Sequence, residues 1–415
     1  MQSIRSFTQA GIATRTAICC LSLVAGGCGS GSLPTLWTVQ DGPCTESTGI
    51  ERALSCARVD IDYSKLGSPW PGTLKLGVPG PPGADGEYLV AVRDETTSFA
   101  DVWQGRLATD PYSNVTISVV GSDVVAVIST SSGPTYRLRK FLGKYPVVER
   151  LGLPAALERP DIADRGTCPE QPGKALDCGE PSRTGDEYTV KVLVGYTPAA
   201  EVWAGGQSAM RSWINLVVAR TNQSFAQSGM RHRIELVFPE KVTAYDEADD
   251  THVDLDRLTK GSHGLDVIQR RRDVLGADVA ILLVDNHDSP GFACQLTEAA
   301  LRSTAFASAA FGVVAIQWVS DGDVFTHELG HIMGAGHDGD GSSKYSRARA
   351  ENATGNCPAW RSIMARTGTG SFAPILYWSN VSVPFCSATG KMGVAGHADN
   401  ARTLMEAACT VAGFR

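Results

Sequence analysis

The feature that most constrains this chain is a short stretch, residues 326–338, that contains three histidines. His327 and His331 are four residues apart, so on a helix they lie on one face, one turn apart. Gly334 follows them and can adopt the positive φ angle that ends a helix and reverses the chain. Such a reversal returns His337 toward the first two histidines, which predicts one site built from three imidazoles.

Three imidazoles that meet at one point suit a tetrahedral zinc ion whose fourth position is left to water. Glu328 follows the first histidine and can reach that water without being a metal ligand. The expected chemistry is hydrolysis: zinc polarises a carbonyl and lowers the pKa of the water, and Glu328 takes the water proton and passes it to the leaving amine. The alternative is a cluster of three satisfied core histidines. An H-E-x-x-H pattern arises by chance in about one chain of this size in a hundred, but the added glycine and third histidine make chance a poor explanation.

Two further residues are expected to support this site. Met364 lies in the apolar segment 362–365 and predicts a methionine turn beneath the zinc, although a methionine in such a segment is often core filler. Asp338 directly follows the third histidine. We expect its carboxylate to accept hydrogen bonds that fix the loop holding His337.

Length and composition limit the number of domains and the kinds of ligand that this chain can bind. The chain has 415 residues, of which 43% are hydrophobic and 20% are charged, which fits two or three globular domains. The net charge of −7 is spread along the chain and gives no basic patch of the kind that binds nucleic acid. The acidic run at residues 246–250 lacks an ordered ligand spacing, so Ca²⁺ binding there is an unsupported alternative.

The N-terminus predicts export. Arg5 and Arg15 precede an uncharged run that is too short to span a bilayer, which is typical of a signal peptide over residues 1–28. The small residues before Cys28 resemble a bacterial lipoprotein processing site, at which Cys28 becomes the lipidated first residue; plain secretion is the alternative. We therefore expect a protein that is lipid-anchored at the cell envelope or secreted after processing, with no other contact to a membrane.

Three of the 11 cysteines, Cys19, Cys20 and Cys28, belong to the predicted signal region, and the other eight form an even set. An even set in an exported chain predicts disulfide bonds. Proximity in the sequence favours two short-range pairs and four cysteines paired among themselves: Cys44–Cys56, Cys168–Cys178, and the group of Cys294, Cys357, Cys386 and Cys409.

Residues 29–150 predict a small all-β domain, because short strands rich in β-branched residues follow one another. The clearest signal is a hairpin in which strands at 115–120 and 124–128 flank a Gly-Ser-Asp turn. Residues 151–187 contain many prolines and scattered charges and indicate a linker that is open to proteolysis.

Residues 188–415 predict an α/β domain with a largely parallel sheet, because apolar strands alternate with amphipathic helices. The expected strands are 188–194, 231–238, 278–284 and 312–318. The expected helices are 207–227, 255–275 with an interruption near 261–264, the histidine-bearing helix, and 397–411.

With these residues in place, residues 188–415 resemble the metzincin zinc peptidases. The pattern H-E-x-x-H-x-x-G-x-x-H with a later methionine turn is the metzincin signature. An aspartate directly after the third histidine, here Asp338, makes the chain resemble the reprolysin-like branch of that family. This branch includes bacterial secreted peptidyl-Asp metallopeptidases. Segments 361–365, 377–380 and 399–402 also resemble that branch. The resemblance implies a twisted, mostly parallel sheet with a zinc helix and a methionine turn, and zinc-dependent hydrolysis of peptide bonds in proteins or peptides.

The resemblance has further implications outside the histidine stretch. Segment 103–106 and the strands after it look like the β-rich propeptide of such enzymes, and segment 303–307 is the expected edge strand on which an extended substrate adds. Cys178 has two interpretations: a thiolate that occupies the open zinc position and keeps a precursor latent, or a disulfide to Cys168. Pairing is favoured because exported cysteines usually pair. Arg366 stands where several related proteins have tyrosine, and no pocket residue identifies a preference for aspartate.

Two other functions are compatible with parts of this pattern. One is a non-catalytic, zinc-containing surface adhesin or scaffold, but a binding module does not need the base Glu328. The other is a metal-dependent hydrolase of small amides.

Overall fold

The structure is a computed structural model. It describes residues 33–43, 53–67, 69–94, 101–131, 133–141, 143–152, 168, 170–178, 187–286, 289–320, 323–339, 343–355, 357–366 and 374–415. The predicted signal peptide with Cys28, and also Cys44, lie outside the described residues.

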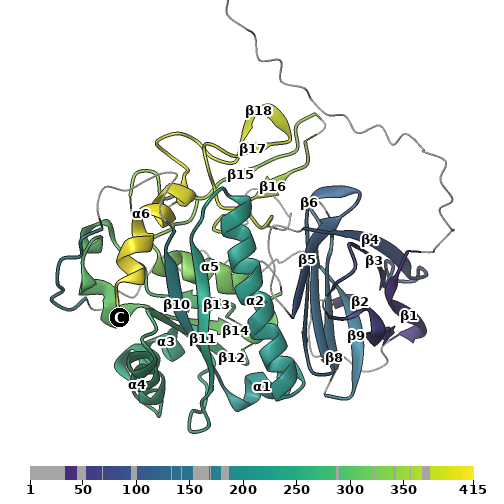
Figure 1. Ribbon diagram of the computed structural model, residues 1–415, viewed down its shortest axis with the longest axis horizontal. Coiled ribbons are helices and arrows are strands. Elements are labelled where there is room, and N and C mark those ends of the chain that lie inside the picture. Colours follow the sequence, from purple (N-terminus) through teal and green to yellow (C-terminus); the bar gives the residue numbers. More distant parts are fainter. Residues whose placement is uncertain are drawn as a thin grey trace, which may run out of the picture. The chain divides into compact units, whose positions relative to one another are not determined.

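The strands β1–β9 close into a barrel in the N-terminal half of the described chain (Figure 1). Neighbouring strands are antiparallel except β1 and β3, whose parallel pairing closes the barrel. Alternate side chains point inward, so that Trp103, Val115, Ile117 and Leu138 are buried in its core. The expected all-β domain is therefore a closed barrel. Its strands are β1 (Thr35–Pro43), β2 (Ala53–Ile61), β3 (Thr73–Val78), β4 (Glu87–Arg93), β5 (Val102–Leu107), β6 (Asp110–Val120), β7 (Asp123–Ser129), β8 (Thr135–Phe141) and β9 (Tyr145–Leu151).

A five-stranded sheet with the order β11-β10-β12-β14-β13 forms the centre of the C-terminal half. The first four strands are parallel, and β13 pairs antiparallel with β14 at one edge. Every residue of β12 and β14 is buried, as expected for parallel strands that are covered on both faces. The strands are β10 (Thr189–Tyr196), β11 (Arg233–Lys241), β12 (Val279–Val284), β13 (Gly291–Ala293) and β14 (Phe311–Ala315).

Six α-helices of the described chain surround this sheet (Figure 1). Helix α2 contacts β11 of the sheet and also β6 and β7 of the barrel, which explains why residues on several of its faces are buried. Helix α5 packs on β13 and β14. The helices are α1 (Pro198–Ala204), α2 (Gln207–Gln227), α3 (Thr251–Lys260), α4 (Asp266–Leu275), α5 (Val324–Ile332) and α6 (Asn400–Ala412), and the short strands β15 (Ala350–Glu351), β16 (Trp360–Arg361), β17 (Pro384–Phe385) and β18 (Ser387–Lys391) lie between α5 and α6.

The expected edge strand at 303–307 is wrong. Residues Thr304–Ala309 form a 3₁₀ helix, which begins where the Ser303 hydroxyl accepts a hydrogen bond from the Ala305 N–H. A side-chain oxygen that satisfies the first free N–H of a helix favours helix over strand at this position. The edge strand of the sheet is β13 instead, twelve residues earlier in the chain at Gly291.

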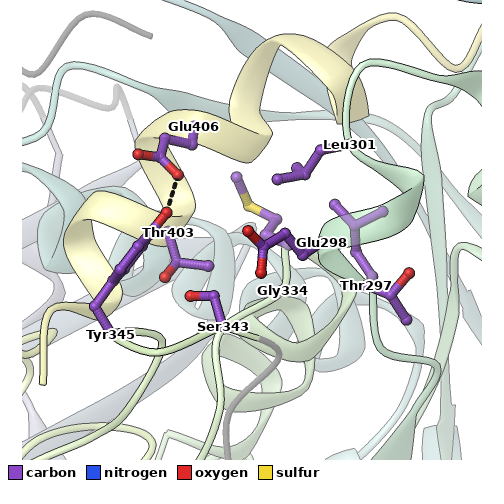
Figure 2. A pocket seen from close by; sticks show the side chains of 10 residues that line it. Thr297, Glu298, Leu301, Gly334, Ser343, Tyr345, Thr403 and Glu406 are labelled. Atoms are coloured by element: carbon purple, nitrogen blue, oxygen red, sulfur yellow. Dashed lines mark hydrogen bonds between the residues drawn. The ribbon is translucent and has the colours of Figure 1, made fainter. Parts of the chain in front are cut away.

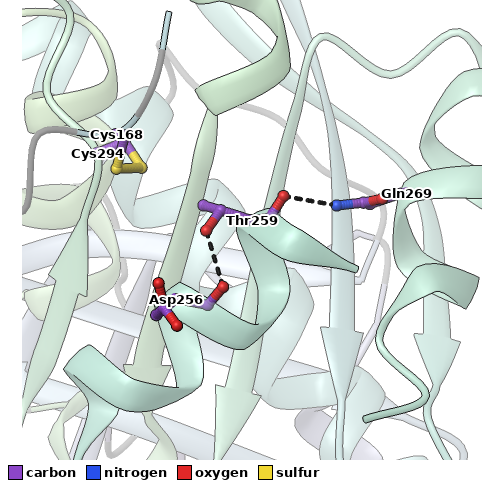
Figure 3. Close-up of a disulfide and its surroundings, with 5 residues drawn as sticks. All are labelled: Cys168, Asp256, Thr259, Gln269 and Cys294. Carbon is purple, nitrogen blue, oxygen red and sulfur yellow. Dashed lines mark hydrogen bonds between the residues drawn. A yellow bond between two sulfur atoms is a disulfide. The ribbon is translucent and has the colours of Figure 1, made fainter. Parts of the chain in front are cut away.

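The disulfide between Cys168 and Cys178 is also wrong. Cys168 bonds to Cys294, as Figure 3 shows, and Cys178 bonds to Cys409. Both bonds attach segment 168–178 to the α/β half, where the Leu176 N–H donates to the Arg302 carbonyl at 2.8 Å. Cys357–Cys386 is a pair within the expected C-terminal group, and Cys56 is disulfide-bonded.

The acidic run at 246–250 forms hydrogen bonds within the fold. Glu247 accepts from the Thr197 hydroxyl and from the Asp285 N–H, and Asp250 caps α3 by accepting from the His252 N–H at 2.9 Å. Within the described ranges, no helix has both the length and the apolar character that crossing a bilayer requires.

Candidate metal centre

Helix α5 holds the first two histidines side by side. His327 and His331 are one turn apart on its face, with ring centroids separated by 4.9 Å. The helix ends at Met333, and Gly334 follows with a φ of 85°, where its N–H donates to the His331 carbonyl at 2.8 Å. A positive φ favours glycine at this position, and it turns the chain back as the sequence predicts.

The returning loop is held from a distant helix. The Asn400 side chain at the start of α6 donates to the Gly336 carbonyl at 3.0 Å and accepts from the Gly336 N–H at 3.3 Å. His337 follows directly, and its Nε2 lies 3.1 Å from Nε2 of His327 and 3.2 Å from Nε2 of His331. The three predicted histidines therefore meet at one point.

The hydrogen bonds at Nδ1 of His327 and His331 determine whether these rings can bind a metal ion through Nε2. Nδ1 of His327 lies 3.0 Å from the Ile363 carbonyl, and Nδ1 of His331 lies 3.1 Å from the Ala335 carbonyl. A carbonyl only accepts, so each Nδ1 carries the proton and each Nε2 presents a lone pair to the centre. Three nitrogens bound to one tetrahedral zinc lie about 3.3 Å apart. The observed spacing fits such an ion, and these histidines form a group of possible metal ligands in the described part of the chain.

The surroundings of His327, which is half-buried, favour its uncharged form. Loss of solvent lowers its pKa to about 3, and the nearby charge of His337 acts in the same direction. A neutral imidazole is the form that binds a metal, so the site needs no proton release from this ring near neutral pH.

Glu328 is buried between the helix and the edge strand. Its side chain is 5% exposed, and a Cβ atom added to Gly291 of β13 would lie 2.9 Å from Glu328 Oε1. Burial raises the pKa of this carboxyl to about 8. A carboxylate whose pKa is brought close to neutrality by its surroundings is suited to general acid–base work.

The methionine turn lies directly beneath the helix. A Cβ atom added to Gly330 would lie 2.8 Å from Sδ of Met364 and 2.7 Å from the ring of Trp378, so only glycine allows this close approach. The same turn supplies the Ile363 carbonyl that orients His327. Sequence reasoning missed this contact because any residue can offer a backbone carbonyl.

Asp338 joins the loop to the methionine turn. One of its carboxylate oxygens accepts a hydrogen bond from the Arg366 N–H at 3.2 Å. Asp338 therefore accepts a hydrogen bond as expected, and it places Arg366 beside the segment that holds His337.

Cys178 is not a candidate for the open metal position. Its sulfur is bonded to Cys409, and a disulfide sulfur is not the thiolate that binds zinc. The latency switch is thus contradicted, and the disulfide alternative holds with a different partner.

A small pocket lies beside the end of α5 (Figure 2). Its volume is about 10 Å³, roughly the space of one water molecule. Glu298 and Glu406 contribute the charged side chains of its lining, and the Tyr345 hydroxyl donates to Glu406. Carboxylates make this pocket unsuitable for an acidic side chain.

The chain is similar to known proteins over most of its length. Residues 186–379 match the Reprolysin_5 family, described as metallo-peptidase family M12. A peptidyl-Asp metalloendopeptidase of Stenotrophomonas maltophilia strain R551-3 is 31% identical over 357 residues, which cover 80% of this chain and 81% of the relative. The chain belongs to metallopeptidase family M12.

Two further relatives have the same name. The protein of Stenotrophomonas maltophilia strain K279a is 31% identical over 80% of this chain and 81% of its own length, and that of Xanthomonas campestris pathovar campestris is 28% identical over 80% of each. A solved chain titled "Structure of a chaperone-substrate complex" aligns with 56% of this chain and 36% of its own, at 18% identity and a TM-score of 0.43, which is too weak to bear on fold or function.

This M12 chain is a zinc metalloendopeptidase, and its substrates are proteins or peptides. The non-catalytic adhesin is not favoured.

Proposed function

We propose that His327, His331 and His337 bind one catalytic zinc ion and that Glu328 is the general base of peptide hydrolysis. The observation that carries this proposal is that Nε2 of His337 lies 3.1 Å from Nε2 of His327 and 3.2 Å from Nε2 of His331, while the Nδ1 protons of His327 and His331 are directed at carbonyls. Zinc bound there would polarise the scissile carbonyl and lower the pKa of a water molecule. Ca²⁺ is not needed in this scheme.

Glu328 performs the proton transfers. Its buried carboxylate takes a proton from the attacking water and delivers it to the leaving amine. Its contact with Gly291 places this chemistry next to the edge strand β13. An extended peptide that adds to β13 as a further strand would present its backbone to Glu328, which is the geometry expected of a metzincin cleft.

Removal of the metal tests this function. Purified protein should degrade casein, and dialysis against a zinc chelator should reduce the rate to the background of a boiled sample, because no other group in the scheme polarises the carbonyl. Addition of one equivalent of Zn²⁺ should restore the rate, whereas Ca²⁺ alone should not. Full activity after complete removal of zinc would contradict the proposal. Cleavage restricted to dipeptides would favour the small-amide hydrolase.

We propose further that the enzyme cleaves bonds that adjoin an aspartate. The relatives are named peptidyl-Asp metalloendopeptidases, which supports a preference for aspartate. The position of Arg366 immediately after the methionine turn supports it as well. Its N–H donates to the Asp338 carboxylate at 3.2 Å, and its positive charge contributes to the lowered pKa of His327. A guanidinium can pair with a substrate carboxylate through two hydrogen bonds.

A matched pair of peptides tests the role of Arg366. Wild-type protein should cleave a peptide with aspartate about 10- to 100-fold faster than the same peptide with asparagine, the range of a charged hydrogen bond. Arg366→Gln should lose at least tenfold of that preference while its rate on the asparagine peptide changes little. Arg270→Gln, at an exposed arginine of α4, is the control and should keep the preference. An unchanged preference in Arg366→Gln would place the selectivity elsewhere.

Export remains part of the proposed function, because the N-terminal residues and the disulfides both favour it. The barrel is proposed to be a propeptide-like domain, and residues 151–187 are proposed to be a linker that is open to cleavage. Metabolic labelling with palmitate tests the lipid anchor: label should enter the chain and should be lost in Cys28→Ser.

A further inference from the structure

A buried ion pair fixes the residue from which the histidine-bearing helix starts. Arg220 of α2 donates to both carboxylate oxygens of Asp323, from Nε at 2.6 Å and from Nη2 at 3.1 Å. The two residues are 1% and 5% exposed. The carbonyl of Asp323 also accepts a hydrogen bond from the His327 N–H at 2.9 Å. Asp323 therefore links Arg220 to the backbone of His327, one of the candidate zinc ligands.

The backbone of Asp323 needs such a constraint. Its φ is 54° and its ψ is 41°, a left-handed conformation that aspartate adopts more often than most residues other than glycine but still at some cost. Its carboxylate makes no capping bond to α5 and is directed to Arg220 instead. The ion pair therefore offsets the cost of the conformation that sets the direction of α5.

The barrel completes the surroundings of Arg220. The hydroxyl of Ser129 on β7 accepts from Nη2 at 3.1 Å, and the hydroxyl of Thr116 on β6 lies 3.5 Å from Nη1. The next residue of α2 adds a parallel contact, because the Thr221 hydroxyl lies 2.9 Å from the hydroxyl of Thr326, which precedes His327.

A second arginine reaches the same region from the barrel. Nη1 of Arg137 on β8 donates to the Gln317 carbonyl at 3.0 Å and to the Ser320 hydroxyl at 3.1 Å, in the turn that leads to α5. Arg137 pairs with Glu149 within the barrel at 2.7 Å. Burial alone would raise the pKa of Glu149, but the charges of Arg137 and Arg139 outweigh it and lower that pKa, so the pair stays ionised.

Apolar contacts join the two halves along β7. Val124, Ala126 and Ile128 lie in the barrel core, whereas Val125 and Val127, on the opposite face of the strand, are 0% exposed and belong to the core of the α/β half. A strand buried on both faces is part of two cores. Separation of the barrel would expose these valines together with the charges of Arg137 and Arg220.

We propose that the barrel positions the metal centre, with Arg220 as the positioning residue that acts through Asp323 on the start of α5. This inference rests on the proposed zinc ligation. Without the barrel hydroxyls, Arg220 loses partners in a buried place and its hold on Asp323 weakens. The start of α5 then relaxes, and His327 and His331 lose their fixed placement against His337, which is held separately by Asn400. Zinc affinity should fall although no ligand has changed.

Full-length variants test this chain of contacts by zinc affinity. Thr116→Val combined with Ser129→Ala removes only the barrel hydroxyls, and Arg220→Gln removes the guanidinium. Arg272→Gln is the matched control, because Arg272 is a 0% exposed arginine that donates to backbone carbonyls, including that of Ala307 at 2.6 Å, and does not contact α5 in any described bond. The zinc dissociation constant is measured by competition with a chromogenic chelator, and kcat and KM are measured on one peptide.

The dissociation constant should rise about tenfold in Arg220→Gln and at least threefold in the barrel double variant, and it should stay within twofold of wild type in Arg272→Gln. With saturating zinc, kcat should recover in the barrel double variant while KM stays unchanged, and Arg220→Lys should recover part of the affinity. Unchanged zinc affinity in the barrel double variant, or an equal loss in Arg272→Gln, would overturn the inference. Absence of zinc binding in wild-type protein would instead overturn the proposed function. If Arg220→Gln does not fold, the barrel double variant alone decides.

Discussion

Glu328→Gln should lower kcat/KM on a protein substrate by about 10³-fold and leave the zinc content at one ion per chain. Glutamine keeps the shape of the buried side chain next to Gly291 but cannot take a proton from water. Because burial raises the pKa of Glu328 to about 8, the carboxyl needs a neighbouring positive charge to be ionised at neutral pH. Hydrolysis rates and zinc content of the same preparation provide the test.

Glu235→Gln is the matched control for this experiment. Glu235 is an exposed glutamate of β11, so its variant should keep activity within twofold of wild type. A loss of less than tenfold in Glu328→Gln would remove Glu328 from proton transfer. A loss accompanied by loss of zinc would make it a structural residue of the site.

His337→Ala should lose its zinc on dialysis, and its activity should fall by at least about 10³-fold. Two imidazoles on one helix face leave the ion without the ligand that closes its coordination shell. The loop should keep its course, because Asn400 holds Gly336 through two hydrogen bonds that do not involve the histidine. Elemental analysis after dialysis gives the zinc content, and circular dichroism reports the fold.

His263→Ala serves as the control for histidine removal, because His263 is exposed in the turn between α3 and α4. It should retain zinc and activity. If His337→Ala also retained one zinc per chain after dialysis, a different third ligand would be required.

The local parts of the site could be predicted from the sequence. The spacing of His327 and His331 follows from the helix period, and Gly334 supplies the positive φ that returns His337. These are interactions between residues close in sequence, and their geometry is fixed by the backbone alone.

The parts that depend on distant residues could not be predicted in this way. The Ile363 carbonyl orients His327 from 36 residues away, and the Asn400 side chain holds Gly336, next to His337, from 64 residues away. Proximity in sequence suggested a bond between Cys168 and Cys178, but their partners are 126 and 231 residues distant. The family resemblance implied an edge strand at 303–307, but the Ser303 hydroxyl caps a 3₁₀ helix that begins there.

The burial of the charged residue Arg220 could not be predicted from the sequence either. On a helical pattern, a lone arginine among apolar residues indicates a solvated face, yet Arg220 is buried between the sheet and the barrel. Only the packing of β6 and β7 on α2 explains why a charge stands there.

X-ray absorption at the zinc edge of the purified protein tests most directly whether three imidazoles share one ion. We expect a four-coordinate shell of nitrogen and oxygen at about 2.0–2.1 Å with scattering from three imidazole rings. In His337→Ala reloaded with zinc, the imidazole contribution should fall from three rings to two. Sulfur at about 2.3 Å, or a spectrum that does not change in His337→Ala, would contradict the convergence of these three residues on the metal.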